Sequence, residues 1–164
     1  MAGADDDLAA GYELAYSEAR RALEDQDQSV NELRSRAGVL MAAAAITTSF
    51  FGGQALTGRG IGVWDWLAIA SFVVLGATVL MVLWPRHDWQ FTVDAEAFIR
   101  DYLEPASGEP LPCRAIHRDL ALHMSASYKS NRDQYRRLIS AFRVGEILLI
   151  LEVASWVVAL VQRR

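Results

Sequence analysis

Residues 66–84 read WLAIASFVVLGATVLMVLW, a run without a formal charge that is bracketed by two tryptophans. At about 1.5 Å per residue, a helix of this length crosses the roughly 30 Å hydrocarbon layer of a bilayer. Indole rings favour the membrane interface, because the ring is apolar while its N–H stays hydrated. Pro85 and Arg86 follow directly and end the helix. This segment predicts an integral membrane protein.

A second uncharged run precedes the first. Residues 37–56 read AGVLMAAAAITTSFFGGQAL and show no polar stripe of the kind that a surface helix of a soluble protein carries. Residues 57–65 between the runs contain three glycines and suit a short turn. We therefore expect residues 37–84 to form an antiparallel transmembrane hairpin.

Residues 144–161, VGEILLILEVASWVVALV, are also long enough to cross, but they contain Glu146 and Glu152. A charged carboxylate at mid-bilayer costs roughly 2–3 kcal/mol on insertion scales. The segment can cross with both glutamates facing helices or water, cross with Glu152 protonated, or lie along the membrane surface. We predict a crossing, with residues 144–164 as a third transmembrane element, because the other side chains are strongly apolar.

The two glutamates are candidate intramembrane polar sites. In one interpretation they line a pore or proton path; in the other, Glu146 reaches the interface and Glu152 bonds a neighbouring helix. Six residues correspond to a net rotation of about 240° around a helix, so the two side chains do not share a face. We expect one glutamate to line a pore and the other to pair with a neighbouring group.

Charge asymmetry predicts the sidedness. Four arginines precede residue 37, and nine Lys or Arg residues lie between 86 and 143. Because positive residues stay in the cytoplasm, we expect a multi-pass protein of the inner membrane with a cytoplasmic N-terminus and a cytoplasmic segment 86–143. A third crossing puts Arg163 and Arg164 outside, which conflicts with this rule and is the best argument for the surface-helix alternative.

Two water-facing segments, 1–36 and 114–143, carry heptad-like seams and predict helical stalks. The seam positions are Tyr12, Ala15, Ala19, Leu23, Gln26, Val30, Leu33 and Ala37 in one and Ile116, Leu120, Met124, Ser127, Asn131, Tyr135, Leu138 and Phe142 in the other. If the third crossing exists, the stalks run in the same direction and can pack in parallel. Residues 85–113 are expected to be a cytoplasmic connector with a short amphipathic helix.

Two further groups of residues flank or enter the membrane. Small residues continue the first stripe and allow close helix packing in lipid: Gly38, Ala42, Ala45, Ser49 and Gly53. An arginine cluster just inside the membrane fixes topology and suits contact with anionic lipid: Arg132, Arg136, Arg137 and Arg143.

No pattern of catalytic residues is present in the sequence. Cys113 and His117 are four apart and could share a helix face, but two ligands are too few for a metal site, and His123 falls on another face. Phosphate-binding and zinc-protease motifs are absent from the sequence. We expect no enzyme activity, no metal and no cofactor. Without a large basic excess, we expect no nucleic-acid partner.

The stretches LRSRAGVLMAAAAITTSFFGGQAL (33–56) and HMSASYKSNRDQYRRLISAFRVGEILLILEVASWVV (123–158) resemble a group of small multi-pass membrane proteins, chiefly actinobacterial, that brings no known function with it. The order of stalk helix, hairpin and second long helix is similar, in architecture only, to SLATT-type two-transmembrane effectors. That resemblance implies oligomerisation and membrane breaching in conflict systems, and a third crossing departs from it.

Together these features predict an all-α membrane protein with three transmembrane helices and a long helical cytoplasmic stalk. The first functional hypothesis is a non-enzymatic homo-oligomer, assembled through the coiled-coil seams, that forms or gates a pore. The alternative is a membrane scaffold or accessory subunit whose stalk holds a cytoplasmic protein partner. A small transporter fits less well, since no inverted repeat or broken helix pair is visible.

Overall fold

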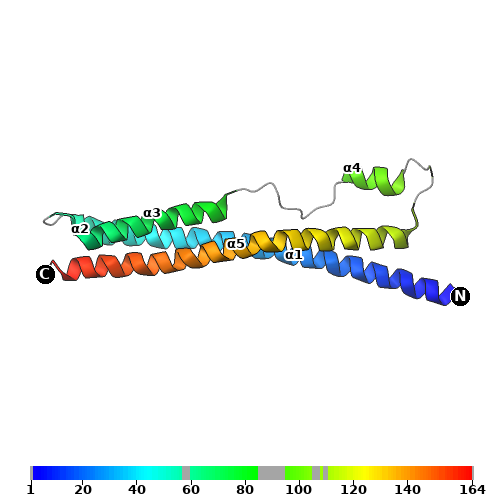
Figure 1. The fold of residues 1–164 in the computed structure, drawn as a ribbon, viewed down its shortest axis with the longest axis horizontal. Helices are drawn as coiled ribbons and strands as arrows, with labels where there is room; N and C mark the ends of the chain where they lie inside the picture. The colour runs from blue at the N-terminus through cyan, green and yellow to red at the C-terminus, as the bar shows by residue number, and fades with distance from the viewer. Residues whose placement is uncertain (1, 57–59, 85–94, 105–107, 109–110, 164) are drawn as a thin grey trace. The chain divides into compact units, whose positions relative to one another are not determined.

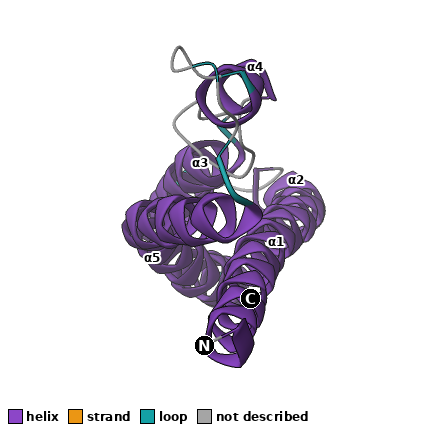
Figure 2. Cartoon of the chain, turned by 90° about the vertical axis from the view of Figure 1, so that its right-hand side faces the viewer, coloured by secondary structure: helices purple, strands orange, loops and turns teal. Residues whose placement is uncertain are grey.

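The computed structural model describes residues 2–56, 60–84, 95–104, 108 and 111–163, and helix is the only regular structure among them (Figure 2). The elements are α1 (Ala2–Thr47), a π-helical turn (Thr48–Gly52), α2 (Gly53–Leu56), α3 (Val63–Leu83), α4 (Ala95–Phe98), a second π-helical turn (Ile99–Leu103) and α5 (Cys113–Val161). The predicted all-α class is confirmed.

The chain divides into two compact units. The polar unit comprises Met1–Val30 and Arg86–Gln134, and the apolar unit comprises Asn31–Pro85 and Tyr135–Arg164. The long helices α1 and α5 contribute to both units, because no proline interrupts either helix.

In the polar unit, α1 and α5 run side by side in the same direction. The ring of Tyr16 stacks on His117 with centroids 5.4 Å apart. Nε2 of Gln26 donates to the carbonyl oxygen of Tyr128 at 3.4 Å. Residue numbers rise together along both helices, so the two stalk segments pack in parallel, as their seams predict. The buried positions are Leu23, Gln26, Val30, Ile116, Leu120, Met124, Ser127 and Asn131.

The connector contributes a short helix to the polar unit. Within the connector 85–113, residues 95–103 form α4 and the second π-helical turn, while residues 85–94 lie outside the described part. The hydroxyl of Tyr102 donates to Asp119 on α5, and the backbone N–H of Leu111 donates to the carbonyl oxygen of Tyr102 at 3.1 Å. The hydrogen bond to Asp119, with burial and the nearby negative charge, raises the pKa of Tyr102 to about 12.

In the apolar unit, α3 lies alongside the C-terminal halves of α1 and α5 (Figure 1). A Cβ added to Gly145 of α5 would meet a methyl carbon of Leu40 of α1 at 2.9 Å. A Cβ added to Gly76 of α3 would meet Met41 of α1 at 3.7 Å. Glycine therefore lets the helix backbones approach closely, and a side chain at residue 145 would displace the end of the Leu40 side chain.

The ends of α3 follow from local chemistry. The N–H of Gly62 donates to Oδ2 of Asp65 at 2.7 Å, which satisfies one of the free donors at the start of the helix. At the other end Trp84 leaves the helical conformation with ψ of 124°. Pro85 disfavours an α-helical residue before it, so the sequence ends the helix there.

Two helices in the described part, α3 and α5, are long and apolar enough to cross a membrane. By this measure α1 is not a third, because its α-helical part ends at Thr47 and the apolar run continues through the π-helical turn and α2. The structure therefore contains two spanning candidates, where the sequence predicts three crossings.

The apolar unit exposes large apolar side chains and buries a few polar ones within its apolar core. Its interior holds Asp65, Ser71, Glu152 and Ser155, each at most 3% exposed. Large aliphatic side chains lie on its outside, and Ile46 and Ile150 are each 70% exposed. Water-soluble proteins bury such side chains and rarely expose large contiguous apolar patches.

Candidate functional site

Glu152 is the central polar residue of the apolar unit. Its side chain is 0% exposed and accepts a hydrogen bond from the hydroxyl of Thr48. The other carboxyl oxygen has no hydrogen-bond partner in the described part of the chain. The indole of Trp156, one turn further along α5, lies next to the carboxyl group without meeting the geometry of a hydrogen bond. Glu152 thus bridges α5 to α1 and is closed off from the surface.

The π-helical turn at Thr48–Gly52 faces this carboxyl group. Such turns insert one extra residue into a helix and frequently occur at functional sites. A Cβ on Gly52 would lie 3.4 Å from the ring of Trp156, so the indole lies directly beside the π-helical turn. Trp156 also packs on Ala68 of α3, and Phe51 covers the pair. The turn, the indole and the carboxyl group therefore form one packed polar cluster.

Glu146 occupies a different environment. Its side chain is exposed, and no ion pair or hydrogen bond to it is found among the residues that the structure describes. The two glutamates therefore point to different surroundings, as their spacing predicts. A channel within one chain lined by both is incompatible with this arrangement.

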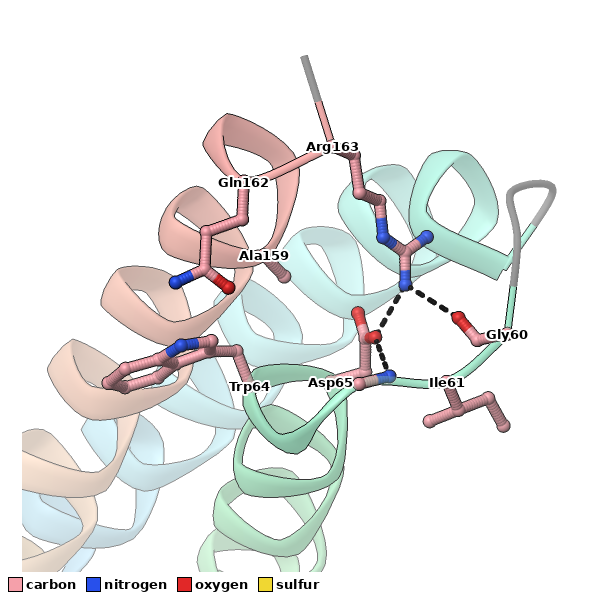
Figure 3. Close-up of a pocket in the computed structure, with 8 residues that line it drawn as sticks. Gly60, Ile61, Trp64, Asp65, Ala159, Gln162 and Arg163 are labelled. Carbon is pink, nitrogen blue, oxygen red and sulfur yellow. Dashed lines mark hydrogen bonds and ion pairs between the residues drawn. The ribbon is translucent and has the colours of Figure 1, made fainter.

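A second polar site joins the start of α3 to the C-terminal end of α5 (Figure 3). Nη2 of Arg163 lies 2.5 Å from Oδ2 of Asp65 and donates to the carbonyl oxygen of Gly60 at 3.2 Å. Asp65 is 1% exposed and Arg163 is 24% exposed, so water reaches the arginine but not the aspartate. Oδ1 of Asp65 has no hydrogen-bond partner in the described part of the chain.

This ion pair sits in a cavity of about 270 Å³ that Trp64, Ala159 and Gln162 also line (Figure 3). The sequence does not predict it, because its members are 98 positions apart. The pairing neutralises Arg163, one of the two arginines that conflict with the positive-inside rule. Arg164, the other, lies outside the described residues.

The predicted small-residue stripe lies beside the face that packs within the chain. Gly38, Ala42, Ser49 and Gly53 are exposed, and a Cβ on either glycine would meet nothing within 4 Å. Residues that pack inward are instead Ala37, Ala44 and Gly52. Each of these three residues directly precedes a member of the stripe: Ala37 precedes Gly38, Ala44 precedes Ala45 and Gly52 precedes Gly53. Packing of the stripe against a second chain stays a prediction.

The predicted arginine cluster is exposed, whereas Cys113 and His117 differ in exposure. The side chains of Arg132, Arg136, Arg137 and Arg143 are exposed. Cys113 is a free, exposed thiol, and His117 stacks on a tyrosine ring rather than facing a metal site. No group of three potential metal ligands occurs among the residues described.

Comparison with protein-family models, curated proteins and solved structures yields no match to this chain.

Proposed function

We propose that the chain is an integral protein of the bacterial inner membrane whose apolar unit crosses the bilayer three times and whose polar unit forms a cytoplasmic stalk. The exposed apolar surface of the apolar unit carries this proposal. Only 28% of the apolar window in either α3 or α5 is buried inside the structure. A core helix of a soluble protein would be mostly buried, whereas a helix in lipid needs no protein cover.

The ion pair at the end of α5 supports the third crossing. Because Arg163 contacts Asp65 at the start of α3, the C-terminal end of α5 lies at the same end of the apolar unit as the turn between the hairpin helices. A helix along the membrane surface would not follow α3 from one end to the other. Enclosure of Glu152 also removes the cost of exposing a carboxyl group to lipid.

The activity that we propose is non-enzymatic: homo-oligomers of the chain perturb or permeabilise the bilayer. Exposed Glu146 supports this, because a carboxyl group on an apolar surface gains from water or a second chain. The exposed stripe from Gly38 to Gly53 offers a face for close approach of that second chain. The architectural resemblance to SLATT-type effectors agrees with this activity.

A scaffold or accessory subunit is the second candidate, and one observation favours it. Glu152 is closed within a single chain, so one chain offers no polar path across the bilayer. Any pore must therefore form between chains. If none forms, the parallel helices of the polar unit remain as the surface for a cytoplasmic protein partner.

Leakage from liposomes separates the two candidates. Purified protein is reconstituted into dye-filled vesicles, and its oligomeric state is measured in the same lipid. We expect dye leakage, with Glu146→Gln changing its rate and Glu104→Gln, an exposed glutamate of the polar unit, leaving the rate unchanged. A confirmed oligomer that leaks no dye contradicts the pore and supports the scaffold.

A further inference from the structure

We infer that a groove between α3 and α5 binds one anionic phospholipid, with the phosphate at two arginines and an acyl chain along the apolar floor. This inference rests on the proposed membrane insertion. The groove encloses about 410 Å³ and lies wholly within the apolar unit. Its lining consists of Met81 from α3 and of Arg136, Arg137, Ser140, Ala141 and Val144 from α5.

The arginines at the edge of the groove suit a phosphodiester. The lining of the groove itself is almost wholly apolar, so Arg136 and Arg137 line it with their aliphatic stems. Arg136 and Arg137 are both exposed, and neither guanidinium has an ion-pair partner among the described residues. A guanidinium offers a planar fork of donors that matches two phosphate oxygens at once. Two adjacent forks without a carboxylate partner therefore attract an anion rather than a cation.

The remainder of the groove suits a hydrocarbon chain. Met81 and Val144 are 46% and 48% exposed, although both are apolar. Residues 137, 141 and 144 follow one another at helical steps of four and three, so they share one face of α5. An acyl chain on this face covers apolar side chains that no part of the described chain covers.

The position along the helices suits a headgroup. Arg136 precedes Val144 by eight residues, which is about 12 Å along a helix. Exposed Trp84 follows α3 directly, and tryptophan marks the membrane interface. The two arginines therefore lie at or just beyond the depth of the phosphates when α3 spans the bilayer.

The arginine cluster supplies a matched control. Of the four arginines that the sequence singles out, only Arg136 and Arg137 line the groove. Arg132 and Arg143 are equally exposed but are not part of its lining. Removing either pair lowers the charge equally, so only a defined site distinguishes the two double variants.

Native mass spectrometry of the detergent-solubilised full chain, titrated with phosphatidylglycerol or phosphatidylcholine, tests the inference. One basic residue near an anionic headgroup is worth roughly a fivefold gain in affinity. We expect one phosphatidylglycerol to bind preferentially and about 25-fold more weakly to Arg136→Gln/Arg137→Gln. Arg132→Gln/Arg143→Gln should stay within about threefold of the wild type.

Met81→Trp narrows the apolar part without changing charge and should also weaken lipid binding. Glycerol phosphate, which has the headgroup chemistry but no chains, should not compete. Equal losses in the two double variants would overturn the site in favour of diffuse attraction, and competition by glycerol phosphate would show a site for free anions. If the chain stays in the membrane during alkaline extraction but shows no preference for phosphatidylglycerol, only the inference of a lipid site is refuted. Release by alkaline extraction instead refutes the proposed membrane insertion.

Discussion

Breaking the ion pair between Asp65 and Arg163 should destabilise the apolar unit in an asymmetric way. Asp65 is 1% exposed, whereas Arg163 is 24% exposed and reaches water. Removing one partner of a buried pair costs roughly 3–5 kcal/mol, because the other charge is left uncompensated. Since water screens part of this pair, we expect Arg163→Gln to lower the free energy of unfolding by about 2–4 kcal/mol.

Replacing Asp65 instead of Arg163 should lower the free energy of unfolding by less. In Asp65→Asn the amide oxygen can still accept the bond from the N–H of Gly62, and the freed guanidinium can turn into water. We expect a loss of about 1–2 kcal/mol for this variant. The double variant should then be close to Asp65→Asn alone, because the buried charge is gone and nothing remains to be compensated.

The assay is reversible unfolding in mixed micelles, followed by tryptophan fluorescence, as a double-mutant cycle. Arg143→Gln is the control, because Arg143 is an exposed arginine of α5 with no ion pair among the described residues, and it should stay within about 0.5 kcal/mol of the wild type. The reasoning is refuted if Arg163→Gln is no more destabilising than this control, or if the two single losses simply add.

Two further predictions concern packing and pH. Gly38→Ala has open space and should stabilise by up to about 1 kcal/mol in the same unfolding assay, because alanine favours the helix over glycine. Gly145→Ala should lose most of this gain, because its Cβ would meet a methyl carbon of Leu40 at 2.9 Å and that side chain must shift. Equal effects of the two substitutions would contradict the packing. The pKa of Tyr102, about 12 against an ordinary value of 10.0, means that folding favours the neutral phenol. That contribution is complete below pH 10 and is lost as pH rises to about 12. Ultraviolet titration should show a phenol ionising near pH 12 that moves lower in Asp119→Asn; an unmoved titration would exclude the hydrogen bond as its cause.

The local periodicity of apolar residues predicts much of the fold. Residues such as Leu23, Val30 and Leu120 recur at helical steps of three, four or seven, and the side chains so spaced are buried between α1 and α5. The proline after Trp84 ends α3 as the sequence predicts, whereas α3 begins at Val63, inside the predicted turn 57–65. These features depend on neighbours within one or two turns, which a single sequence displays.

Contacts between segments that are distant in the sequence could not be predicted from local periodicity. No sequence pattern predicts the π-helical turn at Thr48–Gly52. The hydrogen bond from Thr48 of this turn to Glu152 joins residues that are 104 positions apart. Residue size and helical spacing predict the small-residue stripe, yet it is Gly145, outside the stripe, that makes the close approach to another helix. Which glycine faces a neighbour depends on the rotation of the helix, which tertiary packing sets.

Labelling from the two sides of the membrane tests the three-crossing topology most directly. Cys113, the sole thiol, is exposed and lies in the segment expected in the cytoplasm, and Gln162 lies at the far end of α5. In intact cells, an impermeant maleimide should label Gln162→Cys in a Cys113→Ser background and should reach Cys113 of the wild type only after permeabilisation. Labelling of both positions from the same side would contradict a third crossing, and recovery of the chain in the soluble fraction would contradict insertion altogether.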